Sequence, residues 1–187
     1  MIKEVSSWKR IKLGNRRGQV WVETVIYTLI AFTLIGLVLT FVKPEIDETR
    51  DKGLVEQSIQ VMNDIDLIIR NIGTPGNQRV VKVGISKGEL NIDGVRDLIF
   101  FDLESQYKYS ESGQKVGHGS LVIYTTEEGA AYNVNITSNY SGGYNLKFQN
   151  VDELRRLGAA STPYRISISN DGLDTNGDTI INFDVVI

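Results

Sequence analysis

The sequence contains no cysteine and only one histidine, His118. Without cysteine the chain can form no disulfide bond, has no thiolate metal site and lacks a cysteine nucleophile. A single histidine excludes a metal site built from several imidazoles and removes most histidine-based chemistry. We therefore expect no cofactor.

The net charge of −3 is distributed unevenly along the chain. Residues 1–18 carry six basic residues and one acidic residue, a net charge of +5, which leaves −8 for the remainder. An acidic body argues against nucleic acid as a partner, because phosphate binding needs clustered Lys and Arg. Basic residues before a first apolar span hold that flank in the cytoplasm, and the rest of the chain is then expected outside.

A long, nearly uncharged stretch follows the basic residues. Residues 20–42 contain one charged residue, Glu23, and the stretch ends at Lys43-Pro44. At about 1.5 Å per residue, a helix of this length spans roughly 35 Å, enough to cross a hydrocarbon core of about 30 Å. The stretch is longer than a secretory signal and no small-residue cleavage site follows it. An uncleaved signal anchor is therefore one interpretation.

The apolar pattern becomes periodic after Pro44. Between residues 54 and 72, apolar residues recur at steps of three and four, which indicates one face of a helix. Charged residues are expected mostly on the opposite side: Glu56, Asp64, Asp66 and Arg70. The Gly73–Gly76 segment ends the helix near residue 72. Pro44 either kinks this helix by removing one backbone hydrogen bond or marks the membrane boundary, and Gly53 loosens it.

The rest of the chain alternates short apolar segments with glycine-rich turns, which predicts β-strands. These are expected over residues 79–85, 89–92, 98–103, 121–126, 131–137, 144–148, 164–169 and 180–187. Alternation in residues 132–137 and 165–169 indicates one solvated face and hence an antiparallel sheet, and 151–157 is expected to be a short helical turn. The predicted fold class is α+β, with a long N-terminal helix whose first half is a transmembrane or filament-core segment. Its second half packs on an antiparallel β-sheet domain.

The junction between the basic leader and the apolar stretch has a specific pattern. The leader ends in Gly18, Gln19 follows, and Glu23 is the fifth residue after the glycine. This pattern resembles the class III signal peptide of type IV pilins, and the Gln-x-x-x-Glu opening is most similar to archaeal adhesion-type pilins. Trp21 stands where the archaeal pattern often has serine. The resemblance covers about residues 10–45.

This resemblance implies that a prepilin peptidase cuts between Gly18 and Gln19 on the cytoplasmic face and leaves the apolar helix in place. The chain would then consist of a leader (1–18), a hydrophobic transmembrane and assembly helix (19–44) and an extracellular head domain (45–187). Its implied partners are copies of itself, the peptidase and the pilus assembly machinery in the membrane. The implied function is that of a structural subunit of a cell-surface filament used for adhesion.

Glu23 has a physical explanation in this scheme. A lone carboxylate inside a bilayer costs a few kcal/mol, and cleavage would free the α-amine of Gln19 near the start of the same helix. Pairing with the amine of a neighbouring subunit would offset that cost and set the axial register. The alternative is that Glu23, one turn into the helix, only reaches the membrane interface.

Three weaker patterns occur in the body of the chain. Asn135 and Asn139 each begin a glycosylation sequon. Asp174, Asn176 and Asp178 place oxygen ligands at alternate positions, as in a calcium loop, but the sixth-position glycine and twelfth-position acid are missing. A hairpin turn is the favoured interpretation there. His118 is expected in an exposed loop.

The two alternatives to a filament subunit are an anchored binding domain and an anchored enzyme. The tyrosines of the strand region, which could form a sugar-binding surface, are more simply explained by packing on half-buried strands: Tyr107, Tyr109, Tyr124, Tyr132, Tyr140 and Tyr144. An enzyme is not expected, because no nucleophile or acid–base motif occurs. The acidic pairs Asp102/Glu104 and Glu127/Glu128 would indicate a glycosidase only if they converged across a cleft. The main alternative to a filament subunit is an uncleaved, single-pass, signal-anchored extracellular binding or adhesin domain.

Overall fold

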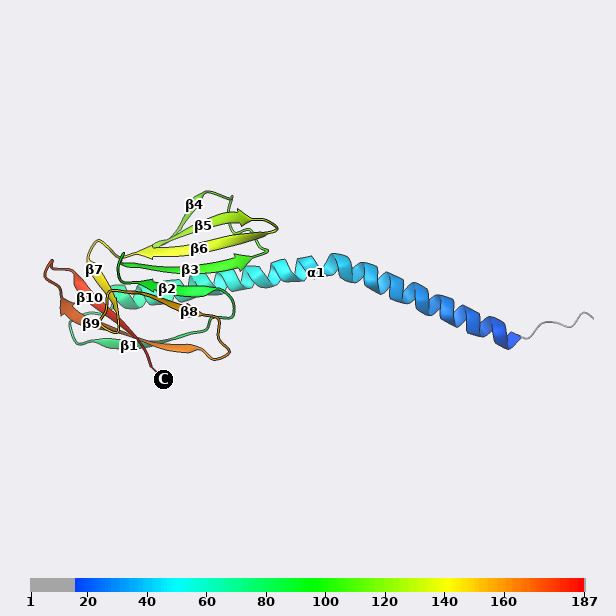
Figure 1. Ribbon diagram of the computed structural model, residues 1–187, viewed down its shortest axis with the longest axis horizontal. Coiled ribbons are helices and arrows are strands. Elements are labelled where there is room, and N and C mark those ends of the chain that lie inside the picture. Colours follow the sequence, from blue (N-terminus) through cyan, green and yellow to red (C-terminus); the bar gives the residue numbers. More distant parts are fainter. Residues whose placement is uncertain (1–15, 187) are drawn as a thin grey trace, which may run out of the picture. The chain divides into compact units, whose positions relative to one another are not determined.

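The computed structural model describes residues 16–186, with side chains from Val20 onward. The long helix α1 (Arg16–Arg70) comes first and the strands of a β-rich domain follow it (Figure 1). The chain divides into two compact units, Met1–Lys43 and Pro44–Ile187, so the boundary falls inside α1. The predicted α+β class, with a long N-terminal helix and a β-sheet domain, is confirmed.

The strands of the second unit form two sheets. They are β1 (Gln78–Val83), β2 (Glu89–Asp93), β3 (Leu98–Ser105), β4 (Lys115–His118), β5 (Leu121–Glu128), β6 (Ala131–Asn139), β7 (Tyr144–Phe148), β8 (Leu154–Gly158), β9 (Tyr164–Leu173) and β10 (Thr179–Val185). One sheet has the order β1-β9-β10-β7 and the other β4-β5-β6-β3-β2-β8. The pairs within them are antiparallel apart from β7 and β10, which run parallel. An antiparallel architecture was expected, and this parallel pair is an addition to it.

The C-terminal part of α1 supplies one side of the core. Its buried apolar residues lie three or four positions apart, as the periodicity predicts: Val55, Ile59, Met62, Ile65 and Ile69. They form one hydrophobic cluster with inward-facing residues of both sheets. Figure 1 shows this part of α1 running beside the strands. The amphipathic helix therefore buries its apolar face within its own unit.

The helix ends two residues earlier than the sequence predicts. It stops at Arg70, and the Nδ2 atom of Asn77 donates a hydrogen bond of 2.9 Å to the carbonyl of Ile72. Gly73 follows with a φ of 81°, a conformation that glycine adopts without strain and that commonly ends helices. The glycine-based stop signal is therefore correct, and only its position shifts.

The helical turn expected over residues 151–157 is wrong. Most of this segment is strand β8, which pairs with β2 so that Leu157 lies opposite Leu90. A tight turn precedes it, with Gln149 and Asn150 at φ values of 51° and 64°. Two consecutive residues in this region are typical of a type I′ hairpin turn. The sequence did not predict this turn because it contains neither an Asn-Gly nor an Asp-Gly pair, the usual signals of a two-residue hairpin turn.

Strand β4 is also absent from the sequence expectation. His118 is exposed, as expected, but it is the last residue of this edge strand and does not lie in a loop. The strand contains Gly117 and is exposed throughout, so it lacks the alternation by which half-buried strands are recognised. It is positioned by its pairing with β5, in which Val116 lies opposite Ile123.

Candidate functional site

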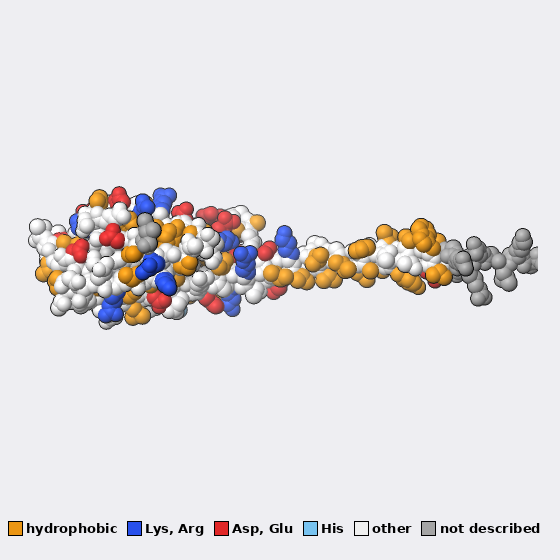
Figure 2. Space-filling view, turned by 90° about the horizontal axis from the view of Figure 1, so that it is seen from below, with side chains coloured by type: hydrophobic (Ala, Val, Ile, Leu, Met, Phe, Trp, Pro, Cys, Tyr) orange, Lys and Arg blue, Asp and Glu red, His pale blue; other side chains and the backbone are white. Residues whose placement is uncertain are grey.

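The most distinctive surface of the described chain is the apolar part of α1, residues 20–42. Each side chain in this segment is exposed, including Trp21 at 70%, Phe32 at 74% and Phe41 at 73%. Figure 2 shows apolar side chains along this part of the helix and charged side chains over the second unit. By length and composition α1 could cross a membrane. The long apolar N-terminal helix is therefore a possible transmembrane or signal-anchor segment.

The polar groups of this segment are arranged to suit an apolar environment. Its threonine hydroxyls donate to backbone carbonyls four residues earlier, at 2.8–2.9 Å, in Thr24, Thr28, Thr33 and Thr40. A hydroxyl that is bonded within its own helix exposes no unsatisfied donor to lipid or to a neighbouring helix, where such a donor would cost free energy. Apart from Glu23, the segment can thus contact hydrocarbon or another apolar helix on each of its sides.

Glu23 is the one charged residue of this segment, and it is exposed. Gly18 and Gln19, the expected cleavage positions, fall inside the bounds of α1, and their side chains lie outside the description. The basic leader that would be removed lies largely outside the described residues as well. Cleavage at Gly18 and the assembly role of Glu23 therefore stay predictions.

Pro44 lies inside α1, at the boundary between the two compact units. The helix continues through Pro44 and through Gly53. At Gly53 a side-chain Cβ would meet no other atom within 4 Å, so crowding does not require glycine there.

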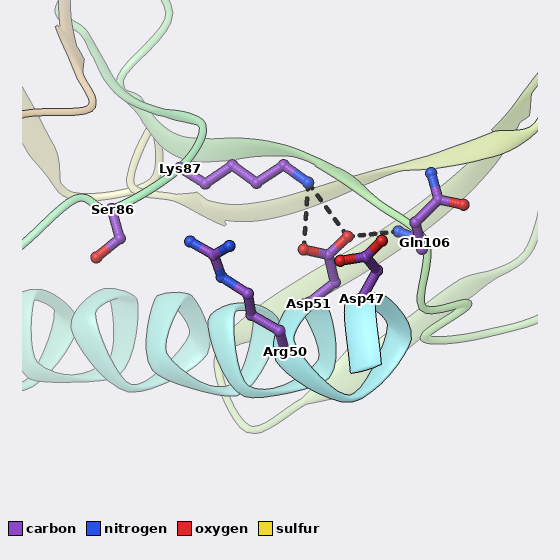
Figure 3. Close-up of a pocket in the computed structure, with 6 residues that line it drawn as sticks. All are labelled: Asp47, Arg50, Asp51, Ser86, Lys87 and Gln106. Carbon is purple, nitrogen blue, oxygen red and sulfur yellow. Dashed lines mark hydrogen bonds and ion pairs between the residues drawn. The ribbon is translucent and has the colours of Figure 1, made fainter. Parts of the chain in front are cut away.

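A buried polar contact between α1 and the connections of the β-strand region centres on Asp51 (Figure 3). This carboxylate is 5% exposed. Lys87, from the connection between β1 and β2, reaches its two oxygens at 3.1 and 3.2 Å, and the backbone N–H of Gln106 donates to one of them at 2.7 Å. Asp47, Arg50 and Ser86 complete the lining of this depression. Asp51 therefore links this part of α1 to two separate connections of the β-strand region.

A second buried carboxylate, Asp66, lies about four helical turns further along. It is 4% exposed and accepts hydrogen bonds from the Nε of Arg70 at 2.8 Å, the hydroxyl of Ser120 at 2.7 Å and the hydroxyl of Tyr140 at 2.9 Å. Ser138 of β6 adds a longer contact at 3.3 Å. Asp66 thus joins the end of the helix to residues that flank or belong to β5 and β6.

The protonation of Asp66 follows from these partners. Burial by itself raises the pKa of this carboxyl group, but the hydrogen bonds from Arg70, Ser120 and Tyr140 outweigh it, so the pKa is lowered. Burial also raises the pKa of Tyr140, whose hydroxyl therefore stays protonated and donates to the carboxylate. The sequence expectation placed Asp66 with the charges on the solvent side of the helix, and that is wrong. The available signal was its spacing, since Asp66 follows Met62 by four residues and precedes Ile69 by three.

The segment around Asp174 is a hairpin turn between β9 and β10, the favoured interpretation from sequence. One carboxylate oxygen of Asp174 accepts from the backbone N–H groups of Asn176 and Asp178, at 2.8 and 2.9 Å, and the other accepts from Asn145 at 3.0 Å. The hydrogen bond from Asn145, with those of the turn, lowers the pKa of Asp174. Its oxygens are therefore engaged by the turn and by Asn145 of β7. Within the described residues, no group of three or more His, Asp or Glu side chains could hold a metal ion.

The two sequon asparagines differ in accessibility. Asn135 is partly buried on β6 and its Nδ2 donates to Asp102 at 2.7 Å. Asn139 is exposed at the end of the same strand, and its Oδ1 accepts from the N–H and hydroxyl of Ser141 at 2.9 and 2.8 Å. Asn139 is therefore the more accessible of the two acceptor positions.

The tyrosines do not form one aromatic surface. Tyr140 is buried and packs edge-on against Tyr144, with ring centroids 6.0 Å apart. Tyr107 and Tyr109 pack at the margin of the core. The packing interpretation thus holds for these four residues, whereas Tyr124 lies on the outer face of the six-stranded sheet.

Comparison of the chain with protein-family models, with curated proteins and with solved structures finds no match in any of the three.

Proposed function

We propose that this protein is a structural subunit of a type IV pilus-like cell-surface filament. It is made as a membrane precursor with its N-terminus in the cytoplasm and its head domain outside. A prepilin peptidase removes residues 1–18, and the membrane-resident assembly machinery polymerises the mature chain through its apolar helix. The filament serves adhesion.

The observation that carries this proposal is the contrast between the two parts of α1. Residues 20–42 present apolar side chains on each side of the helix, and burial of such a surface is strongly favourable, at roughly 25 cal/mol per Å². The head, in contrast, already buries its helix face against its own sheets. A lipid bilayer can cover the exposed segment in the precursor, and equivalent helices of other subunits can cover it in a filament.

Glu23 in the apolar span favours a filament subunit over a permanent membrane anchor. A simple anchor does not need a carboxylate in its apolar span, since a charge inside the hydrocarbon is unfavourable. In a filament, the carboxylate of one subunit can pair with the new α-amine of Gln19 in the next. That pair is charge-assisted and lies in a region of low dielectric, where it is stronger than in water.

The first experiment is the intact mass and N-terminal sequence of the protein recovered from the cell surface. We expect the mature chain to begin at Gln19, and we expect Gly18→Phe to leave the leader in place, because a bulky side chain keeps the backbone from entering a narrow peptidase cleft. Val5→Phe is the matched control, since it adds the same ring within the leader but away from the junction. Recovery of surface protein that still begins at Met1 would instead support the uncleaved signal-anchored binding domain.

A further inference from the structure

The outer face of the six-stranded sheet carries a shallow depression around Tyr124. Leu98, Val122, Asn135, Thr137 and Asn139 line it together with Tyr124, and Lys115 is the one charged residue of the lining. These residues alternate along β3, β5 and β6 with the buried residues Ile99, Ile123 and Ile136. The depression is therefore on the side of the sheet that faces away from the hydrophobic core.

Strand register sets an aromatic ring beside a row of planar polar groups. Tyr124 of β5 lies opposite Asn135 of β6, which lies opposite Asp102 of β3. Val122 and Thr137 form the neighbouring opposite pair. Directly opposite residues have Cβ atoms about 4.5–5.5 Å apart, so the ring, the amide and the carboxylate are adjacent on this face.

Hydrogen bonds hold these polar groups in place. The Nδ2 of Asn135 donates to Asp102 at 2.7 Å, and the hydroxyl of Thr137 donates to the Oδ1 of Asn135. The Oδ1 of Asn139 accepts from Ser141, which fixes that amide as well. A ligand that binds here orders few side chains, and this lowers the entropic cost of binding.

The chemistry of the lining selects one kind of ligand. We propose that the depression binds a neutral saccharide. A sugar ring has an apolar C–H face that packs on an aromatic ring and hydroxyl groups that pair with amides and carboxylates. The lining offers one aromatic ring, two apolar side chains, two amides and a hydroxyl. Mostly apolar lining with a few fixed polar groups is the usual composition of a small-molecule site.

Charge and size argue against other occupants. A single lysine is too little to attract an anionic polymer to a unit whose net charge is negative. A stable protein partner covers about 20–30 residues on each side, many more than this depression contains. The proposed binding needs neither leader cleavage nor polymerisation, so it can fail without affecting the proposed function.

The test uses the full chain, produced in a host that does not glycosylate it and kept in a detergent without a sugar headgroup. Saturation-transfer NMR is recorded with maltotriose and with chitotriose as probes. We expect transfer to at least one of them, and a loss of affinity of about tenfold for Tyr124→Ala, equivalent to roughly 1.4 kcal/mol. Tyr132→Ala is the matched control, because Tyr132 lies on the same β5–β6 hairpin but does not line the depression.

A second variant distinguishes loss of binding from loss of folding, in case Tyr124→Ala unfolds the domain. Thr137→Val keeps the shape of the side chain but removes the hydroxyl that holds Asn135, and we expect a loss of about fivefold with the same thermal midpoint as the parent. Absence of transfer from the parent chain to both sugars would overturn the proposal. An equal loss in Tyr124→Ala and the Tyr132→Ala control would overturn it too.

Discussion

The two parts of α1 share one secondary structure and have opposite surfaces. Residues 20–42 are apolar around the whole helix and exposed, whereas residues 55–69 are apolar along one stripe and buried there. Helix formation therefore does not determine which side chains are buried. Burial depends on which residues cover the helix. The strands that follow cover the second part, whereas none of the described residues covers the first part.

The polar residues of the two parts differ in the same way. In the apolar part the threonine hydroxyls bond to their own helix, so they impose no direction in which the segment must face. In the head part Asp51 and Asp66 bond to groups on other elements and fix one orientation and one register. The surface of residues 20–42 therefore suits contact with lipid or with several equivalent helices. The surface of residues 55–69 suits contact only with its own sheets.

Removal of the apolar part tests this comparison most severely. We expect residues 45–187 to fold as a soluble monomer, because the buried face of the helix is covered by its own sheets. Circular dichroism should show a cooperative thermal transition, and light scattering should give the mass of one chain. The full chain in the same buffer without detergent should aggregate. A molten or aggregated 45–187 fragment would mean that the helix face belongs to a neighbouring subunit.

Replacement of Glu23 tests whether the apolar part serves assembly as well as anchoring. We expect Glu23→Ala to be processed and to accumulate in the membrane at least as well as the parent, since a carboxylate in lipid is unfavourable. Few or no filaments should form, as judged by electron microscopy of sheared surface fractions beside immunoblots of membranes. Glu48→Ala, which removes an exposed acid from the head part of α1, should leave filaments intact. Normal filament density in Glu23→Ala cells would reduce Glu23 to an interfacial residue.

A matched pair of side-chain truncations to alanine measures the difference in packing between the two parts of α1. Ile69 is fully buried and Leu37 is 56% exposed. We expect Ile69→Ala to lower the free energy of unfolding of the head by about 2–5 kcal/mol, because a cavity remains where the side chain was. Leu37→Ala should change it by less than about 0.5 kcal/mol. Near-ultraviolet circular dichroism of the tyrosines during denaturant unfolding measures both values, and equal effects would contradict the comparison.

The buried carboxylate at Asp66 gives the smallest effect and one that depends on pH. We expect Asp66→Asn to lower the free energy of unfolding by about 1–3 kcal/mol at pH 7, since charge-assisted hydrogen bonds are lost. The pKa of Asp66 is lowered from 3.8 on folding, so its stabilisation is complete above that value and is lost as the pH falls below it. The parent and the variant should therefore converge in acid.

The control for this experiment is Asp64→Asn. This carboxylate lies two residues away and, among the described residues, accepts a hydrogen bond only from Gln60 on the same helix. It should change the free energy of unfolding by less than about 0.5 kcal/mol at pH 7 and at pH 3. A gap between the parent and Asp66→Asn that stays constant from pH 7 to pH 3 would show that the charge of Asp66 does not stabilise the head.

Sequence reasoning succeeded where the physical signal is local. The apolar stretch, the periodic face of residues 54–72 and the alternating strands β6 and β9 depend on residues near one another, and each is found as a helix or strand. The hairpin at Asp174 was recognisable for the same reason, because its turn residues bond mainly to their own backbone.

Two of the wrong predictions concern features that depend on residues distant in the sequence. Strand β8 is held by β2, and its registry with Leu90 is not visible in residues 154–158. Asp66 occupies an apolar slot of the helix because Ser120, Arg70 and Tyr140 provide its hydrogen bonds. The candidate assembly site is a mixed case. Its apolar surface follows from composition, but the proposed pairing of Glu23 with another subunit concerns a second chain, which the fold of one chain does not test.

The pairing of β1 with β9 has a consequence for biogenesis. Gln78 and Ser167 bond across 89 residues of sequence, and the hydrophobic cluster that includes the buried helix face also includes Ile181 and Phe183 of β10. Such non-local contacts give a high contact order and slow folding. If the head crosses the membrane after its anchor, as proposed, it cannot collapse into its native core until β10 has emerged. The topology itself would keep the translocating chain unfolded and competent for export until synthesis of the head is nearly complete.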